Sequence, residues 1–209
     1  MALEQIFLIR HGQTDWSLSG QHTGRTDLPL TAHGEVMARA LEPYLRSIVF
    51  SGVLTSPRLR ARRTCELAGL GAVAKTDVDL AEWDYGDYEG LRTSEIRTLT
   101  PSWDIWRDGC PGGETPAQVG ERADRVIARL QMFSGNVALF SHGQFGRVLA
   151  ARWIELSASE GRRFALDPAS ISILGHEDVH PPHRVFALWN APPSTGRAPQ
   201  PCADLAKRA

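Results

Sequence analysis

Short apolar runs alternate with helical patterns along this chain, and that alternation constrains its fold more than any other feature. Apolar segments at residues 6–10, 53–55 and 136–140 are each followed by a stretch with helical spacing. Such alternation is typical of α/β folds, in which parallel strands are connected by helices. A length of 209 residues allows one sizeable core. We therefore expect a single α/β domain with a mostly parallel central sheet and helices on both faces.

The predicted helices have local signals at their first residues. Thr31 is a candidate N-cap, and Ser56 as N-cap with Pro57 at the first helical position predicts a helix that runs to about residue 67. A long amphipathic helix follows Thr115. The apolar residues expected on the buried side of the first of these helices are Val36, Ala40, Leu41 and Leu45. The remaining predicted elements are helices at 116–133 and 143–154 and late strands at 171–174 and 185–188, which could pair as a hairpin.

Two segments fall outside the alternating pattern. Residues 76–115 are rich in glycine, tryptophan and acidic residues, and they look like an excursion from the sheet that forms a wall over a site. Residues 191–209 contain several prolines and no periodic pattern, so we expect a proline-rich, mobile tail there. The expected folded domain is therefore residues 1–190.

Composition and charge exclude several classes of protein. Lys and Arg number 23 against 24 Asp and Glu, so no overall field gathers nucleic acid or an anionic membrane. Three scattered cysteines do not make a disulfide framework, and neither a signal peptide nor an apolar run of about 20 residues is evident. We expect a cytoplasmic protein that binds neither nucleic acid nor membrane. The oligomeric state is left open, with a homo-oligomer among the alternatives.

Arg10, His11 and Gly12 follow directly after the first predicted strand. Ligands of open α/β sheets bind at the carboxyl ends of the strands. A neutral imidazole held in a fixed direction can attack phosphorus, and a neighbouring guanidinium can hold phosphoryl oxygens with a planar fork of donors. Taken alone, the tripeptide is more typical of a loop histidine beside an arginine that pairs with a carboxylate. The remaining motifs decide between the two interpretations.

Three further segments favour the catalytic interpretation. Ser56 is followed by several arginines in the first turns of a helix, where anions are attracted, although most such arginines form a solvated face. His142 stands between a predicted strand and a predicted helix, so a second histidine reaches the same sheet edge as His11. Residues 82–90 contain carboxylates among aromatic rings, which exclude water and favour a protonated acid of the kind that a leaving alkoxide needs.

Together these motifs resemble the histidine phosphatase superfamily, the phosphoglycerate mutase-like proteins, over about residues 5–190. The resemblance implies a phosphatase that works through a phosphohistidine intermediate. It implies His11 as the nucleophile, Arg10 and Arg60 as phosphate clamps, His142 as a second histidine that stabilises the phosphoryl group, and Glu82 as the proton donor.

The resemblance also implies substrate contacts. The backbone amides of Thr23 and Gly24 would line the phosphate pocket, and Tyr85 and Arg147 would contact the far end of the substrate, with simple packing and a salt bridge as their alternative roles. The implied substrate-binding residues are Ser17, Thr23, Gly24, Tyr85, Arg107 and Arg147, although Ser17 stands where many members have asparagine. Three stretches are most similar to sedoheptulose bisphosphatases and broad-specificity acid phosphatases, which implies a sugar phosphate or bisphosphate as substrate.

Other functions share parts of this pattern. A phosphoglycerate mutase shares the phosphohistidine, and a non-catalytic module could bind phosphorylated ligands in the same pocket, although this chain keeps both nucleophile and proton donor. A cysteine-based phosphatase needs an arginine six positions after its cysteine. Six positions after Cys110 the chain has Pro116, so this alternative is excluded. No metal or other cofactor is expected. The spacing of His176, His180 and His183 could suit a metal, but the neighbouring prolines favour an exposed turn.

Overall fold

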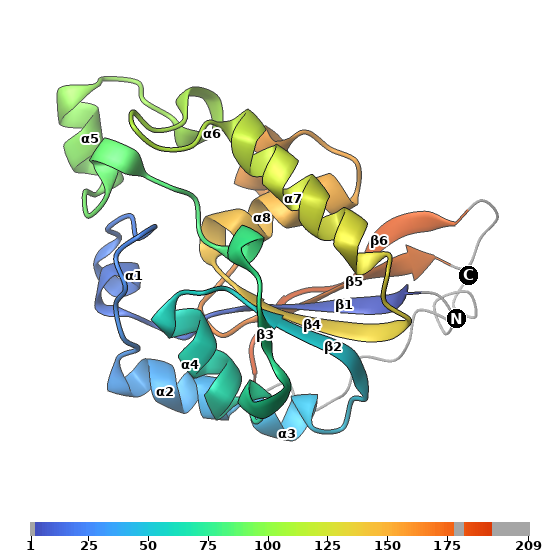
Figure 1. The fold of residues 1–209 in the computed structure, drawn as a ribbon. Coiled ribbons are helices and arrows are strands. Elements are labelled where there is room, and N and C mark those ends of the chain that lie inside the picture. Colours follow the sequence, from blue (N-terminus) through green and yellow to red (C-terminus); the bar gives the residue numbers. More distant parts are fainter. Residues whose placement is uncertain (1–2, 178–181, 194–209) are drawn as a thin grey trace.

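The computed structural model describes residues 3–177 and 182–193, and a six-stranded sheet lies at the centre of this part of the chain (Figure 1). Its strands are β1 (Leu3–Arg10), β2 (Phe50–Thr55), β3 (Lys75–Thr76), β4 (Gly135–Ser141), β5 (Ile171–Glu177) and β6 (His183–Ala191). The strand order is β3-β2-β4-β1-β5-β6. The first four strands pair in parallel, and β5 pairs antiparallel with both β1 and β6. The mostly parallel sheet and the late hairpin were both predicted, and both are confirmed.

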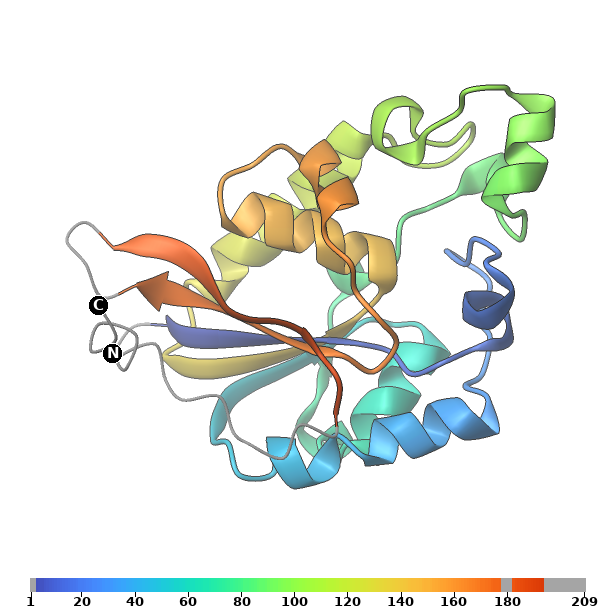
Figure 2. The same ribbon diagram turned by 180° about the vertical axis from the view of Figure 1, so that it is seen from behind.

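Helices cover both faces of this sheet, as predicted (Figures 1 and 2). The α-helices are α1 (Asp15–Ser19), α2 (Ala32–Arg39), α3 (Glu42–Leu45), α4 (Leu59–Leu67), α5 (Thr93–Leu99), α6 (Ile105–Asp108), α7 (Pro116–Leu130) and α8 (Gly143–Trp153). Short 3-10 turns are η1 (Gly71–Val73), η2 (Val78–Leu80), η3 (Gly86–Tyr88) and η4 (Ala158–Arg163). Helices α2, α3 and α4 lie on one face and α7 and α8 on the other, whereas α1 and α5 lie beyond the carboxyl ends of the parallel strands.

Strand β1 is apolar on both sides because both faces of the sheet are covered. Ile6 and Leu8 belong to the core cluster that packs under α7 and α8. Phe7 and Ile9, which point the opposite way, belong to the cluster that packs against the α3 and α4 side. This is why the strand appears in the sequence as a continuous apolar run.

Helix α7 forms where its capping residues and apolar spacing predict it. The Thr115 side chain accepts a hydrogen bond from the Gln118 N–H, the Gln118 side chain accepts one from the Thr115 N–H, and Pro116 occupies the first turn. Val119 and Ala123 are fully buried along the face that meets the sheet and α8. Arg125 on this helix is exposed and Arg129 is partly exposed, whereas Arg122 faces inward and is nearly buried.

The prediction for the helix after β2 was wrong at its start. Ser56 is not the N-cap, since α4 begins at Leu59 after Arg58. The Ser56 hydroxyl instead contacts the ring of His142, and the exposed N–H of Leu59 donates to the carboxylate of Asp27 from a distant loop. A long-range cap of this kind has no local sequence signal.

The helix predicted after Thr31 is correct in its cap but not in its continuity. Thr31 caps α2 through the Gly34 N–H, but the segment divides into α2 and α3. Of the four apolar residues expected to be buried, Leu41 and Leu45 are, whereas Val36 is 61% exposed and Ala40 is exposed. The break changes the direction of the chain, so one helical period cannot serve both pieces.

Residues 76–115 leave the sheet and return through η2, η3, α5 and α6, as predicted for a wall segment. No helix in the described ranges is long and apolar enough to cross a membrane. Of the predicted tail, residues 191–193 are described and Ala191 still belongs to β6, whereas the predictions for 194–209 and for His180 lie outside the described residues.

Candidate active site

Three neighbouring parallel strands bring three polar side chains to one edge of the sheet. In the ladder between β1 and β4, Arg10 lies opposite Ser141, so the next residues, His11 and His142, leave the sheet side by side. The centroids of the two imidazole rings are 5.2 Å apart. Strand β2 ends beside β4, and Ser56 follows it. The predicted meeting of the two histidines is therefore a consequence of strand register.

The ring of His11 is neutral and fixed in direction. Its Nδ1 lies 2.7 Å from the carbonyl oxygen of Gly12. Because a carbonyl can only accept, Nδ1 carries the hydrogen and Nε2 keeps a free lone pair. Burial lowers the pKa of His11 well below its usual value, and the charges of Arg60 and Arg10 lower it further. The arrangement gives an imidazole ready to act as a nucleophile.

The turn that carries His11 needs two glycines in close contact. A Cβ on Gly12 would come 2.5 Å from the carbonyl oxygen of Gly34, and a Cβ on Gly34 would come 2.1 Å from that of Gln13. The Gly12 N–H also donates to Thr64 Oγ1 on α4. Helices α2 and α4 therefore hold the turn after β1 closely, and only glycine fits at the contact.

His142 is fully buried and has one ring nitrogen committed. Its Nε2 lies 2.6 Å from Ser56 Oγ, and its Nδ1 is buried with no hydrogen-bond partner in the described residues. Burial lowers the pKa of His142 well below its usual value, with Arg60 and His11 adding to the effect. A serine hydroxyl that donates to Nε2 leaves the hydrogen on Nδ1, which makes that atom a donor available to a ligand.

Arg10 and Arg60 contribute two more buried donors. Arg10 uses Nη1 on the carbonyl of Leu166, and a Cβ on Gly143 would lie 3.3 Å from its Cζ. Both guanidinium groups have a buried Nε with no partner among the residues described. Burial lowers the pKa of both arginines, whereas Glu82 raises it. Unpaired buried donors are rare in proteins, so their gathering near His11 needs an explanation.

The loop before α2 is held between a cation and an anion. Arg60, fully buried, donates from Nη1 to the carbonyl of Thr26 and from Nη2 to those of Thr23 and Gly24. The carboxylate of Glu89 accepts from the N–H groups of Gly24 and Thr26 at 2.9 to 3.0 Å. The amide of Gly24 is therefore engaged by Glu89 and does not face the pocket, contrary to its implied role, whereas Thr23 does line the pocket.

The carboxylate of Glu82 lies at the start of α8, where it takes the place of a capping side chain. Oε1 accepts from the N–H groups of Trp83 and Phe145, and Oε2 from that of Gln144. These three hydrogen bonds fix the direction of the carboxyl group. The sequence predicted aromatic neighbours that exclude water. The structure instead surrounds the carboxylate with backbone donors, and leaves it 9% exposed at the pocket.

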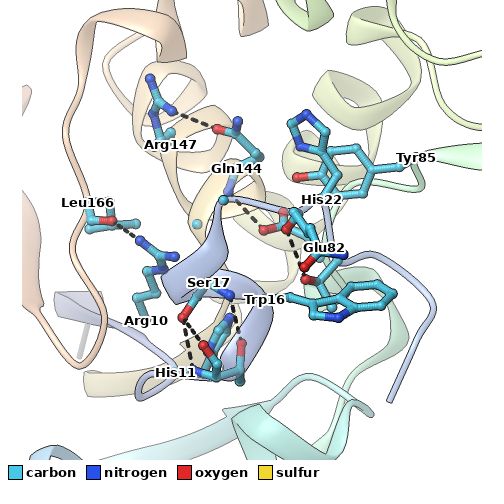
Figure 3. A pocket seen from close by; sticks show the side chains of 15 residues that line it. Arg10, His11, Trp16, Ser17, His22, Glu82, Tyr85, Gln144, Arg147 and Leu166 are labelled. Atoms are coloured by element: carbon cyan, nitrogen blue, oxygen red, sulfur yellow. Dashed lines mark hydrogen bonds between the residues drawn. The ribbon is translucent and has the colours of Figure 1, made fainter. Parts of the chain in front are cut away.

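Arg10, His11 and Glu82 line one pocket with a cavity volume of about 220 Å³ (Figure 3). Arg60 and His142 are not among the residues that line this pocket. Its floor carries Arg10 and His11, and Glu82 projects into it from the wall segment. Tyr85 lines the same wall, is 3% exposed, and stacks on the ring of His22 with centroids 4.6 Å apart. Burial, with Glu82 adding to it, raises the pKa of Tyr85 well above its usual value. Tyr85 is thus a neutral donor.

The remaining implied substrate contacts divide into two groups. Ser17 and Arg147 line the pocket, although the Ser17 hydroxyl is engaged with the Thr14 backbone and Arg147 with Gln144 and nearby carbonyls. Arg107 is not brought to the pocket. It is exposed on α6 and pairs with Asp108. The prediction for Arg107 failed because the sequence pattern does not tell which face of a four-residue helix points inward.

Several pocket and supporting residues were missed in the sequence. Trp16, Gln144 and Leu166 line the pocket, and Glu89 and Arg122 hold its loops. A buried arginine in an amphipathic helix is a signal that could have been noticed at Arg122, since it falls on the apolar face beside Val119 and Ala123. No such signal marks Leu166, whose backbone carbonyl accepts a hydrogen bond from Arg10.

No cluster of three metal-ligating side chains occurs in residues 3–177 and 182–193. Of the histidines whose spacing was considered, His176 and His183 lie on the paired strands β5 and β6. His176 packs edge-on against the ring of Trp153. They are remote in sequence and fold from the pocket of His11.

The geometry and the sequence comparisons agree on the class of protein. The sequence model of the histidine phosphatase superfamily (branch 1) matches residues 6–191 of this chain. An acid phosphatase of Mycobacterium tuberculosis is 45% identical over 177 residues, covering 83% of this chain and 87% of that protein. A sedoheptulose 1,7-bisphosphatase of Saccharomyces cerevisiae is 42% identical over 190 residues, covering 75% of this chain and 69% of that protein.

Solved structures give the same result. The product of an open reading frame of Mycobacterium tuberculosis superposes with a TM-score of 0.83 at 40% identity, covering 91% of this chain and 98% of that one. The chain belongs to the histidine phosphatase superfamily, and the resemblance noted in its motifs is confirmed. Within that superfamily it is a phosphatase.

Proposed function

We propose that this protein hydrolyses small sugar phosphates through a phosphohistidine formed on His11. The observation that carries the proposal is the set of three buried, unpartnered donors near a neutral nucleophilic imidazole: Arg10 Nε, Arg60 Nε and His142 Nδ1. These three donors, unpaired in the described residues, equal in number the three equatorial oxygens of a phosphoryl group during transfer. Because these donors are already in place, they stabilise the charge that develops in the transition state more than they stabilise the bound substrate.

In the first half-reaction His11 Nε2 attacks phosphorus in line with the ester oxygen. The P–N bond forms as the P–O bond breaks, and the leaving alkoxide takes a proton from the carboxyl group of Glu82. The charge on the phosphoryl oxygens is shared by the two guanidinium groups and His142, so positioning and electrostatics supply most of the acceleration.

In the second half-reaction water attacks the phosphohistidine. The Glu82 carboxylate removes a proton from that water, the P–N bond breaks, and inorganic phosphate leaves with His11 again neutral. By microscopic reversibility one carboxyl group thus serves as acid and then as base. Water enters the place in the pocket that the alcohol product has left.

The sugar phosphate preference rests on the pocket and on the relatives. Arg147 lines the pocket apart from the reacting centre and could contact a second anionic or polyhydroxy group, and the yeast relative is named for a sugar bisphosphate. Tyr85 offers a neutral hydroxyl to sugar oxygens. The two described cysteines, Cys65 and Cys110, are free thiols, which fits the reducing cytoplasm where such metabolites occur.

A phosphate-release screen tests the proposal. The purified protein is offered sugar bisphosphates, sugar monophosphates, phosphoglycerates and nucleotides, with and without a chelator, and His11→Ala serves as the blank. We expect release from sugar phosphates that persists in the chelator, together with an acid-labile phosphoryl label on the wild-type chain during turnover. Interconversion of the two monophosphoglycerates without phosphate release would instead establish a mutase.

A further inference from the structure

Arg122 is a nearly buried cation outside the pocket, with every guanidinium nitrogen bonded. It lies on α7 and is 7% exposed. Nε and Nη2 donate to the two carboxylate oxygens of Glu114 at 2.9 and 2.8 Å. Nη1 donates to the carbonyls of Asp79 and Ala81, and Nη2 also donates to that of Glu82. One side chain therefore binds three carbonyls of the segment that ends at the proposed proton donor.

The partners of Arg122 continue to the other side of Glu82. Glu114, besides the ion pair, accepts the N–H of Asp84 through Oε2 at 2.9 Å, and its own carbonyl accepts from Trp83 Nε1. The chain is thus held immediately before Glu82 by Arg122 and immediately after it by Glu114. Because the two side chains are bonded to each other, they form a single bracket around this residue.

Arg122 also touches the helix end that receives the Glu82 carboxylate. Its Cζ lies 4.5 Å from the centre of the Phe145 ring, and the N–H of Phe145 donates to Glu82 Oε1. A cation over an aromatic face is attracted to it. The guanidinium of Arg122 therefore contacts both the Glu82 backbone and the residue that binds the Glu82 carboxylate.

We propose that Arg122 is a positioning residue that sets the direction of the Glu82 carboxyl group for proton transfer. It is not among the residues that line the pocket of His11. A guanidinium is suited to this role because its five donors diverge in a rigid plane, whereas a lysine ammonium offers three donors from a single atom. The proposal rests on the proposed function, since it needs Glu82 to be the proton donor.

The alternative is that Arg122 only stabilises the wall, and the leaving group distinguishes the two. Proton donation matters for an alkyl ester such as glycerol 3-phosphate, whose alkoxide leaves poorly. It matters little for 4-nitrophenyl phosphate, whose phenolate leaves unprotonated. A loss of positioning should therefore lower kcat/KM for the alkyl ester selectively, whereas general loosening of the fold should lower both.

The variants are Arg122→Lys and, as reference for the acid, Glu82→Gln. Arg125→Met is the matched control, because Arg125 lies one turn away on the same helix and pairs with the carboxylate of Asp79 at the surface. Leaving the partly buried Glu114 without its partner destabilises the fold. The double variant Arg122→Met with Glu114→Met removes both charges, and it is measured alongside Arg122→Lys. Thermal unfolding confirms that each protein is folded before kinetics.

We expect Arg122→Lys and the double variant to lower kcat/KM for the alkyl ester about 10-fold or more. We expect a change of less than about 3-fold for the aryl ester, and no change on either for Arg125→Met. Equal losses on both esters in folded variants, with Glu82→Gln still selective, would overturn the role of Arg122. If Glu82→Gln itself shows no selectivity, the proposed proton donor is wrong, and the inference about Arg122 falls with it.

Discussion

The two sides of the pocket are held by different kinds of interaction. On the floor, His11 and His142 follow paired strands, and a continuous ladder of backbone hydrogen bonds fixes their separation. On the wall, Glu82 and Tyr85 belong to a segment of short turns between η2 and η3. Its position depends on a few side chains, chiefly Arg122, that bind backbone carbonyls and amides.

The difference separates what the fold supplies from what individual residues supply. A strand register is cooperative, because displacing His11 would disturb hydrogen bonds along all of β1. The wall has no such ladder, so one substitution can shift it without unfolding the sheet. We expect the floor to carry the phosphoryl chemistry, and the wall to carry proton transfer and substrate preference.

The largest effect should follow removal of the nucleophile from the floor. His11→Ala deletes the attacking nitrogen but leaves the sheet intact, so turnover should fall at least about 10³-fold with little change in thermal stability. Steady-state phosphate release and thermal unfolding measure the two quantities. His33→Ala, at an exposed histidine on α2, is the control and should match wild type. Retention of more than a few per cent of activity in His11→Ala would reject this residue as the nucleophile.

A smaller effect should follow a change behind the second histidine. Ser56→Ala leaves His142 Nε2 without its partner, and a missing hydrogen bond of a buried group costs about 1–3 kcal/mol. We expect kcat to fall about 10-fold while KM changes little, because the phosphoryl group loses a fixed donor. Enzyme kinetics on one sugar phosphate measure both parameters.

Ser170→Ala is the matched control for that experiment. Ser170 is 1% exposed, lies next to the Arg10 backbone, and has a hydroxyl without a partner in the described part of the chain. Its truncation should leave kcat within about 2-fold of wild type. Equal kinetics for the two serine variants would mean that the strand ends alone orient His142.

The floor could be predicted from the sequence, for a physical reason. The strand before Arg10 and the strand before His142 are apolar runs that end in polar residues, and parallel strands end at a common edge. The convergence of the residues named there follows from that rule. The common edge was expected from the apolar runs, whereas the register that sets the two histidines side by side came only from the structure. The family resemblance added the roles of these residues.

The wall could be predicted only in outline. The resemblance pointed to Glu82 and Tyr85, and both line the pocket. It also suggested Arg107, which faces outward, and the amide of Gly24, which Glu89 occupies. Contacts between a side chain and a distant backbone depend on tertiary placement, and local sequence patterns do not encode them.

Glu89→Gln tests how far the wall depends on single side chains. The carboxylate binds the N–H groups of Gly24 and Thr26, and an amide presents only one oxygen to them. We expect KM to rise about 3-fold and stability to fall about 1 kcal/mol, because the loop bound by Arg60 loosens on its other side. Kinetics and denaturant unfolding measure these changes, with Glu121→Gln on the exposed side of α7 as control. An unchanged KM would show that Arg60 alone is enough to hold the loop.

The smallest effect should appear in the pH dependence of stability at His22, which joins the wall to the pocket. Burial lowers the pKa of His22 from 6.5 to about 4, against a partly compensating effect of Glu89. Between these values the unfolded chain binds a proton at this residue and the folded chain does not. The stability contributed by neutral His22 is therefore complete above pH 6.5 and is lost as pH falls toward 4.

His22→Gln isolates this contribution, because glutamine does not titrate. Wild type should lose more melting temperature than the variant between about pH 7.5 and pH 5, while His11 and His142, whose pKa values are also lowered, give both proteins a common acid sensitivity. Calorimetry at the two pH values measures the difference. Parallel losses would mean that the ring of His22 becomes protonated without leaving its stack on Tyr85, so that this part of the wall, like the floor, keeps its structure when one of its contacts changes.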